Sequence, residues 1–392
     1  MTNASRNLVR KILSGFRKAD KVAQSNQLGR DNSSAKAVPL HPICLDVLEW
    51  LEQHPEIERK MIREATTFKF QEPKSVEPRF HPIFQLKQAL IAPFFVANLP
   101  NGLVRGWRGV VLLPDGQYPS EITFHSSELL MQEKGYLDPL PDVIPFKGGN
   151  YFVVPLLWWK NYGHWLIDCI GRLLLARDYL PADTKYIIPA KADATQLETL
   201  RLIGIPCEQL ELIDSSETWQ LEHLWYAPMA TRHGIALPPL GRQIGQTILR
   251  GLGIQPQRRD RRVFISRRNL GQRLIVNEEE VEACFRRYGF DVFLPGSLAF
   301  AEEVALFAEA KVLAENTGAG LTNIIFAQPD AIMLDMVDPN YYNAYSLGLA
   351  SSLNIPYWYF FGETCPGINE RLTNLKVPVD VLERTLQQIS NL

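Results

Sequence analysis

Three ionisable side chains recur at helical spacing in NYGHWLIDCIGRLLL, residues 161–175. His164, Asp168 and Arg172 follow one another at intervals of four residues, so a helix would carry them along one face. The other faces are apolar, which predicts burial, and buried ionisable groups need partners or a wet cleft. A carboxylate beside a histidine can act as a general base with an orienting neighbour. The alternative is a structural His–Asp–Arg network that ties the helix to a loop.

An arginine cluster follows the predicted strand in VFISRRN, residues 263–269. Arg267 and Arg268 come directly after that strand, and Arg273 lies a few residues further along. Open α/β sheets bind ligands at the carboxyl ends of their strands, where a guanidinium group can hold phosphate oxygens bidentately. The alternative is a solvated loop, because arginine is abundant in this part of the chain.

A glycine loop, Gly318-Ala319-Gly320, separates a predicted strand from a predicted short helix, with Thr317 before it and Thr322 inside the helix. Glycine lets the backbone approach a ligand closely, and the free N–H groups of a helix start favour an anion. The loop is therefore a candidate phosphate site. A tight turn without a ligand is the alternative.

The same loop can also be compared with a dinucleotide-binding turn. Asp338 lies 20 residues after Gly318, where such a fold places the acid that binds the ribose. However, Asn323 stands at the position of the third glycine, and little chain remains after Asp338. An NAD-dependent oxidoreductase is therefore kept only as an alternative.

The composition of the 392-residue chain is that of a globular protein, with 46% hydrophobic and 21% charged residues. Its net charge of −2 gives no reason to expect a nucleic-acid partner. The five cysteines form no C-x-x-C pair, so we expect reduced thiols in the cytoplasm and no zinc site. The sequence contains no D-x-D or P-loop motif. Backbone amides and arginines are therefore expected to hold phosphate without a metal ion.

Alternating strand and helix patterns predict α/β structure in two successive sets. We expect an N-terminal extension over residues 1–90, with a mobile basic leader and helices, including one over 45–68. Residues 91–240 and 241–392 are expected to form the two α/β domains. Residues 3–24 resemble a basic amphipathic helix, which predicts a peripheral contact with an anionic membrane. A transit peptide or a frayed leader has a similar composition.

Taken in order, three segments resemble glycosyltransferase family 61: residues 161–175, 263–315 and GAGLTNIIFA at 318–327. The likeness covers roughly residues 150 to 337. It implies an α/β fold of the GT-B type, in which two Rossmann-like domains with parallel sheets face a cleft. It also implies metal-independent transfer of a sugar, with inversion, from a nucleotide-sugar donor to a glycan, lipid-linked or protein acceptor. We expect a UDP-linked donor as substrate and no further cofactor.

The resemblance also assigns roles to residues. Arg267 and the loop Gly318-Ala319-Gly320 would hold the donor diphosphate. Asp168, with His164 beside it, would face the acceptor and take its proton. The other donor-binding candidates on this pattern are Arg268, Arg273, Thr317, Thr322 and Asn323.

One position departs from the family pattern. The family commonly has histidine just before Gly-Ala-Gly, whereas this chain has Thr317. A threonine hydroxyl can donate a hydrogen bond to phosphate but cannot become cationic. The departure leaves open a weaker stabilisation of the leaving group, a different donor, or a chain that binds nucleotide sugar without transferring it.

Overall fold

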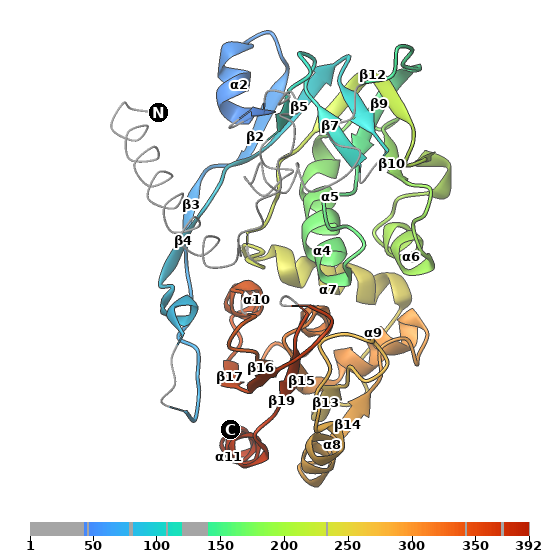
Figure 1. Cartoon of the computed structure of the whole chain (residues 1–392). Coiled ribbons are helices and arrows are strands. Elements are labelled where there is room, and N and C mark those ends of the chain that lie inside the picture. Colours follow the sequence, from blue (N-terminus) through green and yellow to red (C-terminus); the bar gives the residue numbers. More distant parts are fainter. Residues whose placement is uncertain are drawn as a thin grey trace. The chain divides into compact units, whose positions relative to one another are not determined.

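The computed structural model describes residues 43–44, 47–77, 81–106, 109–119, 140–232, 234–341, 343–369 and 372–391 (Figure 1). The basic helix predicted within residues 3–24 lies outside these ranges. In the part of the chain that is described, no helix is long and apolar enough to cross a membrane.

The first sheet is mixed and has the strand order β11-β10-β9-β12-β5-β2. Its parallel strands are β9 (Phe146–Val153), β10 (Lys185–Pro189), β11 (Leu210–Ile213) and β12 (Thr218–Tyr226). Its antiparallel strands are β2 (Arg59–Arg63), β5 (Phe94–Pro100), β6 (Leu103–Arg105) and β7 (Val110–Leu112). The predicted α/β class is confirmed, but the prediction of parallel sheets left out these antiparallel strands.

A helical run connects β9 to β10 at the predicted position. It consists of α4 (Tyr162–His164), the π-helical segment η4 (Trp165–Ile170), α5 (Gly171–Ala176) and the 3-10 turn η5 (Arg177–Tyr179). Asn161 begins the run because its side-chain oxygen accepts hydrogen bonds from the N–H groups of Gly163 and His164. The 3-10 turn η6 (Cys207–Gln209) and helix α6 (Ala194–Leu202) connect the later strands, and α6 begins with a capping box from Asp193.

The helix predicted over residues 45–68 forms only as α2 (Val47–Gln53). Beyond Pro55 the chain turns into β2, which pairs with β5, and then into β3 (Thr66–Lys69), which pairs with β4 (Gln88–Ile91). Pairing with distant strands outweighs local helix propensity there. The remaining short elements of this part are β1 (Ile43–Cys44), β8 (Tyr118–Pro119) and the 3-10 turn η1 (Pro82–Gln85).

The second sheet is entirely parallel and has the order β14-β13-β15-β16-β17 (Figure 1). Its strands are β13 (Arg261–Ile265), β14 (Phe290–Phe293), β15 (Ala310–Asn316), β16 (Ile332–Val337) and β17 (Tyr357–Phe361). The connecting elements are α8 (Glu278–Arg287), α9 (Phe300–Ala308), the 3-10 helix η7 (Ala319–Ile325) and α10 (Tyr345–Leu353). A hairpin of β18 (Glu363–Cys365) and β19 (Asn374–Lys376) and helix α11 (Val379–Ser390) follow. From β13 the chain first adds β14 on one side and then returns to add β15 on the other, and ligands bind at such a switch point in open α/β sheets.

Helix α7 (Leu240–Leu252) packs against helical elements of both sets. One continuous core includes Ile170 of the first set, Ile244 of α7 and Leu313 of the second. Gly245 permits the closest of these contacts, since a Cβ there would lie 2.2 Å from the carbonyl oxygen of Ile325. Burial of this shared apolar surface stabilises the arrangement that positions the site.

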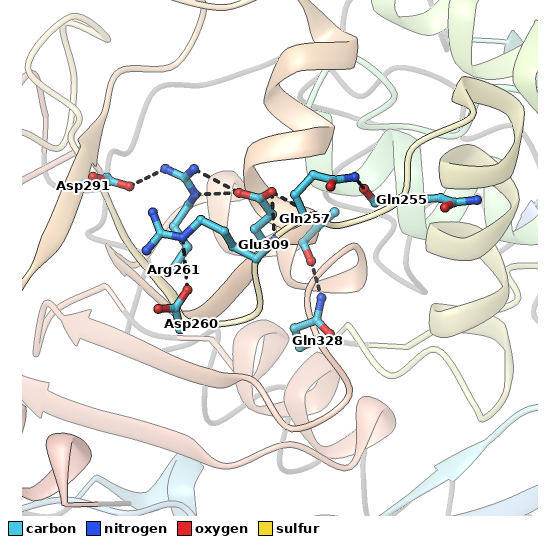
Figure 2. A network of polar contacts seen from close by, with 9 residues as sticks. Gln255, Gln257, Asp260, Arg261, Asp291, Glu309 and Gln328 are labelled. Carbon is cyan, nitrogen blue, oxygen red and sulfur yellow. Dashed lines mark hydrogen bonds and ion pairs between the residues drawn. The ribbon is translucent and has the colours of Figure 1, made fainter.

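A polar network joins the amino ends of the strands in the second sheet (Figure 2). Arg261 donates from Nη1 to Asp291 at 2.6 Å and from Nη2 to Glu309 at 2.9 Å. The other oxygen of Glu309 accepts the backbone N–H of Gln257 at 3.1 Å. We call these residues the amino-edge network.

Candidate active site

The structure brings His164 and Asp168 together. Nδ1 of His164 lies 2.5 Å from Oδ2 of Asp168, and the hydroxyl of Thr231 donates to Oδ1. The Asp168 side chain is buried, yet both of its oxygens have partners. A carboxylate held in this way by a histidine is suited to accept a proton from a substrate.

Arg172 does not join this pair. Its guanidinium group donates to the carbonyl oxygens of Ala227 at 3.1 Å, of Val154 at 3.0 Å and of Val153. The π-helical segment explains the difference, because its turn holds one residue more than an α-helical turn and rotates Arg172 away from Asp168. The alternative His–Asp–Arg network therefore forms only in part: His164 contacts Asp168, but Arg172 binds backbone carbonyl groups instead. Burial lowers the pKa of Arg172.

Two aromatic rings flank His164. The ring of Trp158 lies 5.0 Å from the imidazole and that of Tyr345 lies 5.6 Å from it, between centroids. Trp158 remains 36% exposed, so its ring can also meet a ligand from solvent.

Arg267 lies at the carboxyl end of β13, as predicted, but it is paired with a residue that sequence reasoning missed. Its Nη1 donates to Glu315 at 2.8 Å, and both side chains are buried. The second oxygen of Glu315 accepts the N–H of Leu321 at 2.9 Å. Burial raises the pKa of Glu315, although Arg267 opposes that shift. The carboxylate thus occupies an N–H group at the start of η7 that was expected to be open to phosphate.

Position 318 requires glycine because it lies against the Arg267–Glu315 ion pair, not because of its backbone angles. A Cβ at Gly318 would lie 2.2 Å from a Glu315 oxygen and 2.5 Å from Nη1 of Arg267. Gly320 is constrained similarly, at 2.7 Å from the other Glu315 oxygen. The predicted close approach at this loop exists, but the group that approaches is a carboxylate of the protein itself.

Thr317 is committed to a buried acid. Its hydroxyl donates to Asp335 at 2.7 Å, and Tyr357 donates to the other oxygen of that carboxyl at 2.9 Å. Burial raises the pKa of Asp335 to about 6, against the effect of these hydrogen bonds. The Thr317 hydroxyl is therefore occupied in this structure.

The other two arginines differ in their surroundings. Arg268 is half exposed and pairs with Glu282 at 2.5 Å. Arg273 donates to the carbonyl oxygen of Thr317 at 3.0 Å and lies over the Tyr341 ring, 5.1 Å from its centroid. Arg273 lines a narrow cavity of about 10 Å³, which has room for about one water molecule.

Helix η7 contacts α4, the helix that carries His164. Asn323 accepts a hydrogen bond from the hydroxyl of Tyr162 at 2.6 Å, and Thr322 lies against Gly163. Ala319 is the first residue of η7. The candidate residues for acceptor and donor therefore meet where α4 packs against η7.

Asp338, the acid of the dinucleotide alternative, has its oxygens occupied. They accept hydrogen bonds from the hydroxyls of Thr364 and Thr373 and from the N–H of Asn340. The carboxylate joins the loop after β16 to the β18–β19 hairpin. Among the residues that the structure describes, no group of three or more His, Cys, Asp or Glu side chains is placed to hold a metal ion.

Residues 162–334 match the family model of Glycosyltransferase 61. The resemblance to glycosyltransferase family 61 is confirmed over this range. That family suggests glycosyltransferase activity, with a nucleotide-sugar donor and a glycan acceptor. No curated protein matches the chain.

The family 61 domain contains two site residues that sequence reasoning missed, Thr231 and Glu315. Glu315 left a signal, because it is an acid in the apolar strand pattern KVLAE. Tyr345 lies beyond the matched range and left no motif. Only the folded chain places it beside His164.

Proposed function

We propose that this protein is a metal-independent, inverting glycosyltransferase that moves a sugar from a UDP-linked donor to a hydroxyl acceptor in polysaccharide or glycoconjugate biosynthesis. The observation that carries the proposal is the buried His164–Asp168 pair, which lies beside η7 within the family 61 domain. The transferred sugar in this proposal is a hexose or a pentose.

The proposed reaction begins with attack by an acceptor oxygen on the anomeric carbon. The bond from that carbon to the phosphate oxygen breaks, and its electron pair leaves with the diphosphate. The acceptor proton passes to the carboxylate of Asp168, while Nδ1 of His164 holds that carboxylate in place. Attack from the face opposite the diphosphate inverts the anomeric carbon.

The donor would bind at the carboxyl edge of the second sheet, at the switch point between β13 and β15. Arg267, Arg268, Arg273 and the glycine loop lie at this edge. The cavity of about 10 Å³ is far smaller than a nucleotide site, which usually measures hundreds of Å³. We therefore include in the proposal an opening of the loops after β13 and β16 when the donor binds.

The second candidate is a protein that binds nucleotide sugar without transferring it. Two observations favour it: Glu315 partly neutralises Arg267, and Asp335 takes the hydroxyl of Thr317. Both reduce the positive potential available to a leaving diphosphate.

A ligand panel followed by a turnover assay tests the proposal. UDP, GDP, CMP, NAD and the sugar conjugates of the nucleotides are added to the full chain, with and without Mg²⁺, and thermal unfolding is measured. A ligand at about 100 times its dissociation constant adds roughly 2.7 kcal/mol to stability. We expect a metal-independent shift with UDP and release of UDP from its sugar conjugate. A shift without any release favours the second candidate, and a shift only with NAD favours an oxidoreductase.

The proposal extends to the arrangement of the chain. Residues 91–240 would form the acceptor-side domain and 241–392 the donor-side domain of a GT-B fold, in a cytoplasmic protein that contacts the membrane through residues 3–24. A chain lacking residues 1–36 should then lose partitioning onto anionic vesicles. Unchanged partitioning would contradict the membrane contact.

A further inference from the structure

Two buried hydroxyl groups converge where α4 meets η7 and α10. A Cβ built at Gly163 would lie 2.7 Å from Oγ1 of Thr322 and 3.3 Å from the hydroxyl oxygen of Tyr345. Both oxygens are shielded from solvent; the Thr322 side chain interacts with the Tyr345 hydroxyl, and neither oxygen has a partner among the described residues outside this pair. Two hydroxyls that face only each other retain hydrogen-bonding capacity, and buried polar groups with unused capacity call for an explanation.

The surroundings of the two hydroxyls connect both sides of the proposed reaction. Thr322 belongs to η7, directly after the glycine loop on the donor side. The Tyr345 ring packs against His164, and the negative charge of Asp168 acts on its hydroxyl. The two hydroxyls therefore lie between the base and the donor loop.

We propose, building on the transferase function above, that Tyr345 is a catalytic residue whose hydroxyl, together with that of Thr322, donates hydrogen bonds to the departing diphosphate. The two hydroxyl groups stabilise the phosphate oxygen that gains the electron pair when its bond to the sugar breaks. No proton is transferred, so the balance of the reaction is unchanged. Thr317 cannot serve in this role while its proton is donated to Asp335.

The chemistry of Tyr345 suits a permanent donor. Burial, and then the charge of Asp168, raise the pKa of its hydroxyl well above the ordinary value. The phenol therefore keeps its proton at every working pH and cannot compete with Asp168 as a base. Tyr345 is also held in place, because Gly234 comes so close to its carbonyl oxygen that a Cβ there would lie 2.2 Å away.

Removing these hydroxyls should separate catalysis from stability. Tyr345→Phe keeps the ring against His164, and Thr322→Val keeps the shape of the side chain. Because each hydroxyl faces only the other and has no further described partner, both variants should unfold close to the wild-type temperature. Thr322→Ser is the conservative variant: it restores the hydroxyl and should recover activity that Thr322→Val loses.

The measurements are kcat, the donor KM, the dissociation constant for UDP alone and the unfolding temperature. We expect Tyr345→Phe to lower kcat about 100-fold, the usual loss for one donor to a developing anion, and to weaken UDP binding. A Tyr345→Phe protein with wild-type kcat overturns the inference. So does one in which only the KM for the sugar conjugate rises while UDP binds normally, because that result places the hydroxyl on the sugar.

The wild type distinguishes this inference from the proposed function. If wild type neither binds UDP nor releases it from a sugar conjugate, the transferase proposal fails and the inference fails with it. If wild type transfers and Tyr345→Phe is unaffected, only the inference fails. If wild type binds UDP without turnover, an equal UDP dissociation constant in Tyr345→Phe overturns the inference and a weaker one supports it.

Discussion

Two arginine–glutamate pairs join β13 to β15, and in both pairs the partners are 48 residues apart. Arg261 and Glu309 meet at the amino ends of these strands, whereas Arg267 and Glu315 meet at the carboxyl ends. An arginine meets a glutamate at each end, although the register of the two strands shifts by one residue between Arg261 and Arg262. The two pairs therefore have the same chemistry at opposite edges of one sheet.

The pairs differ in how completely they are satisfied. Arg261 donates from Nε and from both Nη atoms, and Glu309 also accepts two backbone N–H groups. Nε of Arg267 has no partner among the described residues. The carboxyl edge also contains other buried polar atoms with unused hydrogen-bonding capacity: Nε of Arg273, Oδ1 of Asn316, and the hydroxyls of Thr322 and Tyr345, which face each other. The amino-edge pair thus has its polar atoms satisfied, whereas the carboxyl edge retains hydrogen-bonding capacity, which our proposal assigns to the donor.

Transfer activity should respond to changes in the proposed reaction centre and not to changes at the amino edge. Asp168→Asn should show the largest effect. An amide cannot take the acceptor proton, so kcat should fall by about 10²- to 10⁴-fold while nucleotide binding persists. Asp291→Asn, which alters a carboxylate of the amino-edge network, is the matched control and should keep the wild-type rate. Initial rates of sugar transfer by the two variants and the wild type measure the difference. Near-normal transfer by Asp168→Asn would remove that residue as the base.

Stability should respond at both edges, but unequally. Glu315→Ala leaves the buried charge of Arg267 without its ion partner, which should destabilise the protein by about 3–5 kcal/mol. Glu309→Ala disrupts a partly exposed network in which Arg261 retains Asp291, so about 1–2 kcal/mol is expected. Urea unfolding of both variants measures the difference. Equal losses would show that the edge makes no difference to the energetics of the pair.

The smallest expected effect is a pair of opposite pH dependences. Burial raises the pKa of Asp335 to about 6 from 3.8, so the folded state holds this proton more tightly than the unfolded state. Its contribution is complete below the unfolded pKa and is lost as pH rises through the folded value of about 6. Asp335→Asn should remove this decline.

Glu309 should behave in the opposite way. Burial opposes its charge, but hydrogen bonds from Arg261 and two backbone N–H groups hold its pKa below the usual range. Its contribution is present above the unfolded pKa of the group and is lost as pH falls through the folded one. Unfolding free energies of wild type, Asp335→Asn and Glu309→Gln across pH 3 to 7 provide the comparison. Slopes of the same sign would contradict it.

Periodic features of the sequence predicted the strand–helix rhythm and the helical run over residues 161–177. The glycine loop and the strand-end position of Arg267 could be predicted as well, because both follow from local pattern. Arg172 could not, since a π-helical segment alters the angle between residues that an α-helix would align. The helix predicted over residues 45–68 was wrong from residue 59 onward, because the pairing of β2 with β5 and of β3 with β4 depends on distant chain segments.

The partners of the site residues were the least predictable part. Glu315 meets Arg267 across neighbouring strands, and Tyr345 reaches His164 from another element entirely. Such contacts depend on strand order and on helix packing, which single-sequence periodicity does not specify. Sequence therefore identified candidate groups, and the folded chain decided which of them already have partners.

The contact between Trp158 and His164 gives the site an optical reporter. Indole emission depends on the polarity around the ring, and a partly exposed indole against His164, the neighbour of the proposed base, should respond when a ligand excludes water there. The chain has 8 tryptophans, so a Trp158→Phe protein supplies the background that must be subtracted. Rapid-mixing fluorescence could then follow occupancy of the reaction centre in real time, with unmodified protein and unlabelled substrates.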